Sequence, residues 1–315
     1  MNLPIAISYG SYYHYLKPKG KTYKNLNIEA KVQKFNDGEI AVIFPDSIRG
    51  KHIFIFGDTV NNLTELLMTI DAARNSSAGF ITVVLPYYGF CRQDKKGKDR
   101  TSLGAAMIAI ILQAMGVGRV ISIDLHADQI QLAYKIPFEH LSGAHVFEDK
   151  LHDLINTYKI NGVDVLFASP DAGGTERVKK LAKLFNLTYV VCEKDRPEPG
   201  VVGHIRVLAD PAMLKGKVII LVDDIVDTGN TLIKADKAFR EIEVLDVITF
   251  ITHPVLSNNA YDNITKSGIK IITSNTRNKV VGRKNASFEV EDCSDILMRA
   301  IIDISENRSI SQTLC

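Results

Sequence analysis

Three aspartates follow an apolar run in the second half of the chain. The segment 218–231 reads VIILVDDIVDTGNT. Its opening residues are bulky or β-branched and do not alternate with polar ones, which predicts a buried strand. Carboxylates at the end of a buried strand are costly unless a cation, a sugar hydroxyl or water balances them. The segment therefore indicates a binding site at the end of this strand.

The turn after this strand has the composition of an anion site. It offers backbone N–H groups, two threonine hydroxyls and the start of a helical pattern, which together favour a phosphate. The two adjacent carboxylates suit neutral hydroxyls or a hard cation instead. A phosphate beside vicinal hydroxyls describes ribose 5-phosphate, and a helix cap would not need two adjacent aspartates. The expected ribose-phosphate residues are Asp223, Asp224, Asp227, Thr228, Gly229, Asn230 and Thr231.

Short apolar runs alternate with helical patterns along the chain. HIFIF (52–56), FITVVLP (80–86) and KVIILV (217–222) predict strands, and apolar residues three and four apart in ERVKKLAKLF predict a helix. This order is typical of an α/β fold with mostly parallel sheets. Residues 52–87 also resemble residues 217–253 in their order of strand, Asp/Thr turn, helix and strand. We therefore expect two related domains, residues 1–145 and 146–315.

The composition excludes several classes of protein. A net charge of +2 without a dense Lys/Arg tract gives no reason to expect nucleic-acid binding. The longest apolar stretch, residues 103–117, is shorter than the ~20 residues of a membrane span, so it predicts a buried helix or a subunit contact rather than a membrane segment. Widely spaced cysteines and a start without a signal-peptide pattern favour a reduced, cytoplasmic protein.

Five segments taken together resemble a known family. VDDIVDTGNT is similar to the phosphoribosyl-binding signature of the phosphoribosyltransferase fold. KFNDGE (34–39), PYYGFCRQDKKGK (86–98), DLHADQIQ (124–131) and SPDAGGTERVKKLA (169–182) occur in the same order in ribose-phosphate pyrophosphokinases. The resemblance implies two tandem phosphoribosyltransferase-like domains, with ATP on the N-terminal side and ribose phosphate on the C-terminal side. The implied reaction moves the β,γ-pyrophosphoryl group of Mg-ATP to the C1 hydroxyl of ribose 5-phosphate and releases AMP.

Within this resemblance the first half of the chain holds the ATP side. Phe35, Asp37 and Glu39 match the adenine-recognition segment, in which an aromatic ring stacks on the base and an acidic group accepts hydrogen bonds from the 6-amino group. The residues that match the ATP-contacting segment and its positive charge are Arg92, Gln93, Asp94, Lys95 and Lys96.

The resemblance also assigns the catalytic and metal residues. His126 and Asp171 match residues associated with the ATP phosphates and with magnesium. Lys194 and Arg196 match the basic pair of a mobile catalytic loop, which supplies cations to the transition state. The implied substrates and cofactor are ATP, ribose 5-phosphate and Mg²⁺, and the implied assembly is a homo-oligomer built from dimers.

The chain departs from the family at several positions. Asn230 stands where a glycine usually lies, RTSLGAA replaces a segment like RAPISAK, and Asp128 replaces a small residue. We hypothesise that phosphate activation and ADP inhibition are weakened, because a carboxylate repels phosphate. Two alternatives stay open: the same transfer to a larger acceptor such as ADP-ribose, in NAD rebuilding, and a non-catalytic regulatory partner of a synthetase.

Overall fold

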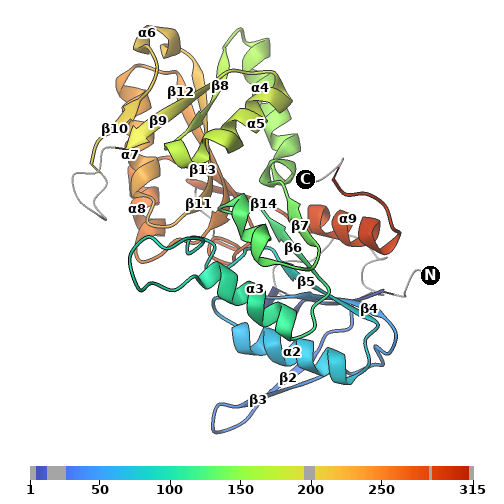
Figure 1. Cartoon of the computed structure of the whole chain (residues 1–315). Coiled ribbons are helices and arrows are strands. Elements are labelled where there is room, and N and C mark those ends of the chain that lie inside the picture. Colours follow the sequence, from blue (N-terminus) through green and yellow to red (C-terminus); the bar gives the residue numbers. More distant parts are fainter. Residues whose placement is uncertain (1–4, 13–25, 195–202, 284–285, 312–315) are drawn as a thin grey trace. The chain divides into compact units, whose positions relative to one another are not determined.

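The chain forms two compact units. A computed structural model describes residues 5–12, 26–194, 203–283 and 286–311 (Figure 1). Unit 1 comprises Met1–Ser142 and Asp292–Cys315, and unit 2 comprises Gly143–Glu291. Both are α/β units with mostly parallel sheets, so the predicted fold class is confirmed.

Unit 1 is built on a five-stranded parallel sheet. The strand order is β1 (Ile5–Ser8), β4 (His52–Phe56), β5 (Phe80–Leu85), β6 (Arg119–Ile123) and β7 (Phe138–Leu141). A separate antiparallel hairpin joins β2 (Lys31–Lys34) to β3 (Ile40–Ile43). The helical segments of this unit are η1 (Gly10–Tyr12), α2 (Leu63–Asn75), α3 (Gly104–Ala114), η2 (Asp128–Ala133) and α9 (Ser294–Ser305).

Unit 2 is built on a seven-stranded sheet with one antiparallel edge strand. The order is β10 (Ile205–Val207), β9 (Tyr189–Lys194), β8 (Val165–Ser169), β11 (Val218–Val226), β12 (Asp246–Pro254), β13 (Lys270–Ser274) and β14 (Phe288–Glu291). Its helical segments are η3 (Gly143–Val146), α4 (Glu148–Ile160), η4 (Ala172–Gly174), α5 (Thr175–Phe185), α6 (Pro211–Leu214), α7 (Asn230–Glu241) and α8 (Ala260–Ser267).

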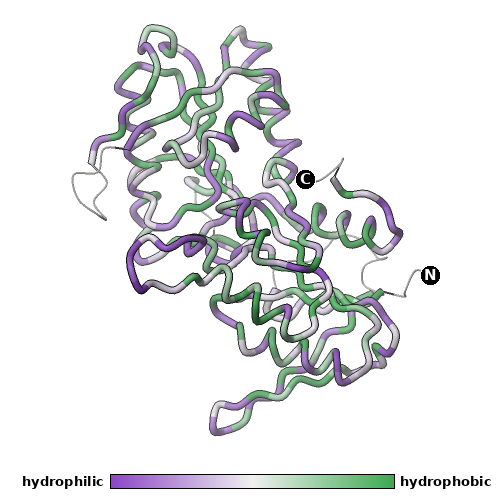
Figure 2. Tube along the Cα trace, in the orientation of Figure 1, coloured by the Kyte–Doolittle hydropathy of each residue, from purple (hydrophilic) through white to green (hydrophobic). Residues whose placement is uncertain are grey.

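Helices cover both faces of the unit 2 sheet. Phe185 of α5 shares one buried cluster with Ile220 of β11, and Phe239 of α7 shares another with Ile219. Because neighbouring residues of a strand point to opposite faces, β11 needs apolar residues at every position before its aspartates. Figure 2 shows this pattern as apolar strands inside more polar helices. The same packing places Asp223 and Asp224 at the carboxyl end of a central strand.

The internal repeat is present in both units. In unit 1, β4 and β5 are parallel neighbours joined through α2, and in unit 2, β11 and β12 are parallel neighbours joined through α7. The two halves are therefore related in structure as well as in sequence pattern.

The end of the chain differs from the expected division into residues 1–145 and 146–315. The structure groups Asp292–Cys315 with unit 1 instead of with the second domain. Buried residues on α9, among them Leu297 and Ile301, explain this placement. Tyr9 of unit 1 also donates a hydrogen bond from its hydroxyl to the sulfur of Met298, at 3.6 Å.

The long apolar stretch forms a short helix. Only Gly104–Ala114 of the stretch is helical, as α3, with Ile108 and Leu112 fully buried. Within the described part of the chain, no helix is long and apolar enough to cross a bilayer.

Candidate active site

The acidic pair lies at the carboxyl end of β11, between β8 and β12 of unit 2. The Asp224 side chain is 5% exposed and that of Asp223 is 18% exposed. The backbone N–H of Asp224 donates to Asp223 Oδ1 at 3.0 Å. Burial raises the pKa of Asp223, and the neighbouring Asp224 raises it further, whereas Arg177 lowers it. Carboxylates in this position need a cation or hydroxyl partners.

The turn after β11 leads directly into α7. Gly229 has a φ of +79°, and α7 begins at the next residue, Asn230. A side chain at Gly229 would be strained by this φ, and its Cβ would lie 2.8 Å from Cδ1 of Ile264. Thr228 and Asn230 are exposed. Because glycine at the N-cap position has no side chain to cap the helix, the turn is suited to receive an anion at the helix start.

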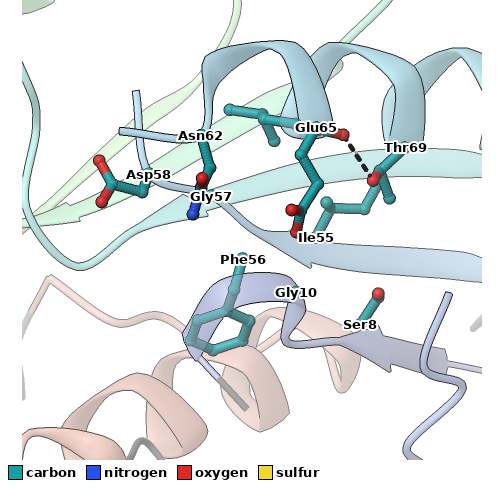
Figure 3. Close-up of a pocket in the computed structure, with 10 residues that line it drawn as sticks. Ser8, Gly10, Ile55, Phe56, Gly57, Asp58, Asn62, Glu65 and Thr69 are labelled. Atoms are coloured by element: carbon teal, nitrogen blue, oxygen red, sulfur yellow. Dashed lines mark hydrogen bonds between the residues drawn. The ribbon is translucent and has the colours of Figure 1, made fainter. Parts of the chain in front are cut away.

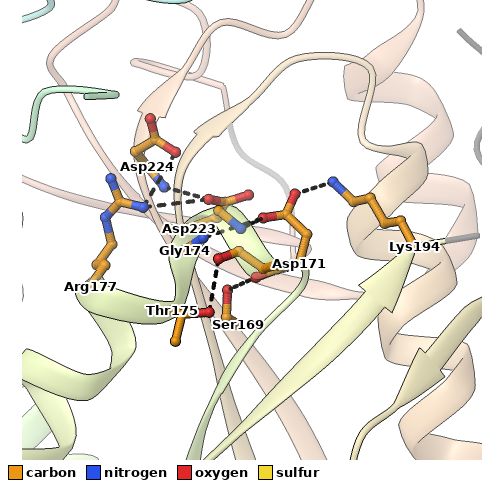
Figure 4. Close-up of polar contacts among 10 residues, drawn as sticks. Ser169, Asp171, Gly174, Thr175, Arg177, Lys194, Asp223 and Asp224 are labelled. Carbon is orange, nitrogen blue, oxygen red and sulfur yellow. Dashed lines mark hydrogen bonds and ion pairs between the residues drawn. The ribbon is translucent and has the colours of Figure 1, made fainter. Parts of the chain in front are cut away.

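Asp171 and Lys194 form an ion pair beside the acidic pair. Asp171 Oδ1 accepts hydrogen bonds from the backbone N–H groups of Gly173, at 2.9 Å, and Gly174, at 3.3 Å. The ammonium group of Lys194, at the end of β9, donates to Asp171 Oδ2 (Figure 4). The hydroxyl of Ser169 donates to the carbonyl oxygen of Asp171 at 2.6 Å and fixes this turn.

Arg177 is the site residue that the sequence prediction missed. It lies in the first turn of α5, and its Nη1 atom is 3.7 Å from Asp223 Oδ1 and 3.5 Å from Asp224 Oδ1 (Figure 4). In the sequence, Arg177 looks like one of several basic residues on the solvent face of a helix. Its position in the first helical turn was the available signal, because a cation there opposes the helix dipole.

The expected adenine-recognition residues lie on the β2–β3 hairpin of unit 1. Phe35 is 45% exposed, so its ring is accessible for stacking. The hairpin turn is closed by hydrogen bonds from Phe35 N–H to the Glu39 carbonyl, at 2.9 Å, and from Glu39 N–H to the Asp37 carboxylate, at 3.0 Å. Asp37 and Glu39 are exposed.

The expected ATP-contacting residues lie on the loop between β5 and α3. Gln93 accepts a hydrogen bond from the hydroxyl of Ser102 at 3.0 Å, and Asp94 accepts one from the side-chain amide of Gln129 at 2.5 Å. Arg92, Lys95 and Lys96 are exposed on the same loop. Gln129 belongs to the segment DLHADQIQ, so this contact joins two of the segments on which the family resemblance was based. His126, after β6, is exposed.

The first copy of the repeat does not keep an open phosphate turn. Asp58, after β4, accepts hydrogen bonds on Oδ1 from the backbone N–H groups of Val60, at 2.9 Å, and Asn61, at 3.1 Å. Asp58, Asn62 and Glu65 line a small cleft at this end of the sheet (Figure 3). A carboxylate of the chain itself thus takes the N–H groups that a phosphate would need.

The structure brings together four of the predicted residues in unit 2: Asp171, Lys194, Asp223 and Asp224. The predicted ATP residues and His126 belong to unit 1. Arg196 lies outside the described residues, so its predicted role as a catalytic cation stays a prediction.

The carboxylates of unit 2 are compatible with magnesium brought by a nucleotide. Among the described residues, no three His, Cys, Asp or Glu side chains form a metal cage. Mg²⁺ usually takes one or two protein carboxylates and completes its shell with phosphates and water. Asp171 fits this role once Lys194 leaves its Oδ2 atom, because a carboxylate oxygen is then available.

This geometry defines a class of protein: an α/β protein of two units. One unit has two aspartates near the carboxyl end of a central strand, followed by a helix N-terminus that is suited to the phosphate of a phosphorylated sugar. Residues 19–116 match the family described as the N-terminal domain of ribose phosphate pyrophosphokinase, and residues 140–284 match the phosphoribosyl transferase domain.

Curated relatives agree with these matches. The chain is 36% identical over 290 residues to a ribose-phosphate pyrophosphokinase of Cereibacter sphaeroides, which covers 90% of this chain and 84% of the relative. It is also 36% identical over 318 residues to that of Chlorobaculum tepidum, covering 99% and 95%. The crystal structure of phosphoribosylpyrophosphate synthetase from Mycobacterium smegmatis matches with a TM-score of 0.82 and 29% identity, over 96% of this chain and 99% of that one. The chain belongs to the ribose-phosphate pyrophosphokinase family.

Proposed function

We propose that this protein transfers the β,γ-pyrophosphoryl group of Mg-ATP to the C1 hydroxyl of ribose 5-phosphate, giving phosphoribosyl pyrophosphate and AMP. The observation that carries the proposal is that Asp223 and Asp224 lie near the carboxyl end of β11, whose last residue, Val226, precedes the turn to the start of α7 at Asn230. Carboxylates accept hydrogen bonds from hydroxyls, and a helix N-terminus attracts phosphate. A ribose phosphate carries both groups, vicinal hydroxyls and a phosphate, that these two features favour.

In this mechanism the residues of unit 2 mainly position the acceptor. Asp223 and Asp224 accept hydrogen bonds from the vicinal hydroxyls, and Thr228–Thr231 hold the 5-phosphate. The C1 oxygen then forms a bond to the β-phosphorus, the bond from that phosphorus to the oxygen of AMP breaks, and the hydroxyl proton passes to solvent. Such transfers depend on positioning and on neutralising charge at the phosphoryl oxygens.

The cations of the site act on the transferred group. Lys194 leaves Asp171 and places its ammonium group on the phosphoryl oxygens, where negative charge moves during the reaction. Arg196 is proposed to do the same. Asp171 would hold Mg²⁺, which when bound neutralises phosphate charge, and His126 of unit 1 is assigned to the ATP phosphates and their metal by the family resemblance alone. The ATP base and phosphates are assigned to Phe35, Asp37, Glu39, Arg92, Gln93, Asp94 and Lys95.

The test is AMP release from Mg-ATP with ribose 5-phosphate and ADP-ribose supplied in parallel reactions. Release with ribose 5-phosphate, and little with ADP-ribose, is the expected result. Preference for ADP-ribose would replace the proposed acceptor and direct attention to Asn230. Release with neither acceptor would leave the regulatory-partner alternative.

We also propose a homo-oligomer built from dimers, in the cytoplasm. Apolar side chains exposed on α3, Met107 at 42% and Ile110 at 65%, support a subunit contact there. The buried free cysteines Cys91, Cys192 and Cys293 support a reducing compartment. Light scattering of the purified protein tests the assembly, and a mass equal to one chain would contradict it.

A further inference from the structure

Arg177 is a basic neighbour of the acidic pair in unit 2. Arg177 Nη1 lies 3.7 Å from Asp223 Oδ1 and 3.5 Å from Asp224 Oδ1. The guanidinium group therefore faces both carboxylates, and its positive charge offsets the negative charge of the pair.

The same unit contains a structural ion pair for comparison. Arg240 of α7 binds Asp236 with two hydrogen bonds, from Nε at 2.8 Å and from Nη2 at 3.1 Å. This i, i+4 pair is on a helix surface and is bidentate. Arg177 differs from it in burial, since its side chain is 19% exposed against 46% for Arg240, and in facing two carboxylates that are adjacent in the sequence, whereas Arg240 faces Asp236 and Asp246.

The place of Arg177 in its helix also argues for a role outside the helix. It lies in the first turn of α5, after Thr175 and Glu176. The positive end of the helix dipole disfavours a cation in this turn. Ordinary helix stability would place the arginine near the other end, so the acidic pair is what compensates for its position.

We propose that Arg177 is a positioning residue of the acceptor site, which neutralises Asp223 and Asp224 together while their oxygens receive the vicinal hydroxyls of ribose 5-phosphate. The inference rests on the proposed function. Two adjacent carboxylates repel each other, and burial strengthens that repulsion. Against the larger effects of burial and of Asp224, Arg177 lowers the pKa of Asp223 and so favours its charged form; a charged carboxylate is an acceptor only, as a donating hydroxyl requires.

The experiment compares three single variants: Arg177→Met, Arg177→Lys and the control Arg240→Met. In Arg177→Met the KM for ribose 5-phosphate should rise by about tenfold or more, which corresponds to ~1.4 kcal/mol. The KM for ATP should stay near the wild-type value. Arg177→Lys should recover part of the acceptor affinity, because it restores one cation. Arg240→Met should lower the melting temperature without changing the acceptor KM.

Three outcomes would overturn the inference. The first is an unchanged acceptor KM in Arg177→Met. The second is a parallel rise of both KM values together with a lower melting temperature, since that would describe a structural arginine. The third arises if Arg177→Met does not fold: the double variant Arg177→Met/Asp223→Asn removes one charge of each sign and should fold, and its failure would make Arg177 a folding residue.

Calorimetry with ribose 5-phosphate separates this inference from the proposed function. If the wild type binds the sugar phosphate but releases no AMP, the proposed function fails, and the binding constants of the variants still decide the role of Arg177. If the wild type neither binds nor reacts, both proposals are wrong.

Discussion

The ammonium group of Lys194 donates a hydrogen bond to Oδ2 of Asp171, so the cation and the carboxylate proposed to act on ATP neutralise each other in this structure. Lys194 is the last residue of β9, and Asp171 lies in the turn after β8, its parallel neighbour. Adjacent parallel strands end at the same edge of a sheet, which explains why residues distant in the sequence meet here. One partner must be released before either can bind a phosphate or its metal.

Removing the amine of Lys194 should impair the chemical step. We expect Lys194→Met to lower kcat by about 10²–10³, the typical loss for one group that stabilises a transition-state charge. Lys217, which pairs with Asp164 at 3.3 Å, is the matched control, because Lys217→Met also breaks an ion pair of the same unit. AMP release measures both. Equal losses in the two variants would contradict a catalytic role.

The acidic pair should affect the acceptor more than ATP. Asp224→Ala removes a buried acceptor for a hydroxyl, and hydrogen bonds to charged groups are worth about 1.5–3 kcal/mol. The acceptor KM should rise by about 10- to 100-fold, with a smaller change for ATP. Asp246→Ala is the control, since Asp246 is the first residue of β12 and pairs with Arg240 and Lys270. An unchanged acceptor KM in Asp224→Ala would defeat the assignment.

The phosphate turn should not tolerate a side chain at Gly229. In Gly229→Ala the new Cβ meets Ile264 at 2.8 Å in addition to the strain of a φ of +79°. Gly216→Ala is a matched control, because Gly216 has a φ of +74° and a Cβ added there would meet nothing within 4 Å. Both variants should lose about 1–2 kcal/mol from backbone strain. Only Gly229→Ala should lose more stability and acceptor affinity, as denaturation and kinetics would show.

Unit 1 should lose stability in acid through His52. Burial, and then Arg119, lowers the pKa of His52 from 6.5 to about 4. The ring is stacked on Phe54, and its Nε2 atom lies 2.7 Å from the hydroxyl of Thr82. The folded state resists protonation and the unfolded state does not. Stability should therefore be unaffected above pH 6.5 and fall between pH 6.5 and 4, by at most ~1.4 kcal/mol per pH unit.

Melting temperatures across this pH range test the assignment. His52→Gln should flatten the acid limb, whereas His204→Gln, at an exposed position, should leave it as in the wild type. Identical pH profiles for the wild type and His52→Gln would show that another group causes the loss.

Phosphate should stimulate this protein weakly. Asp128 is exposed, and its carboxylate pairs with Nδ1 of His140 at 3.2 Å, while Nε2 of the same ring accepts a hydrogen bond from Leu125 N–H at 2.9 Å. This arrangement holds a negative group in place, and a fixed carboxylate repels phosphate. A phosphate titration of activity measures the response, and Asp128→Ala should increase it. Strong stimulation of the wild type would contradict the hypothesis.

The sequence alone was most informative about site residues that lie at the end of an apolar strand. Asp223 and Asp224 could be predicted from the apolar strand that they end, because ligands collect at the carboxyl ends of parallel strands, whereas Asp171 and Lys194 were predicted from the family resemblance alone. Arg177 was missed, because its helix carries several basic residues and its place in the first helical turn, the signal that was available, does not say which carboxylates it faces. The final helix, α9, was assigned to the wrong half for a similar reason: an apolar face predicts burial but does not identify the core that buries it.

The return of α9 to unit 1 has a consequence for the order in which the protein can fold during synthesis. Unit 2 is one continuous segment, Gly143–Glu291, whereas unit 1 needs residues on both sides of it. Domains that are complete fold as they emerge, at synthesis rates of about 5–20 residues per second. The sheet of unit 1 therefore remains without α9 while unit 2 is synthesised, for on the order of ten seconds, and the surface that α9 covers is exposed during that time. The first unit to begin leaving the ribosome is therefore the last whose chain is complete.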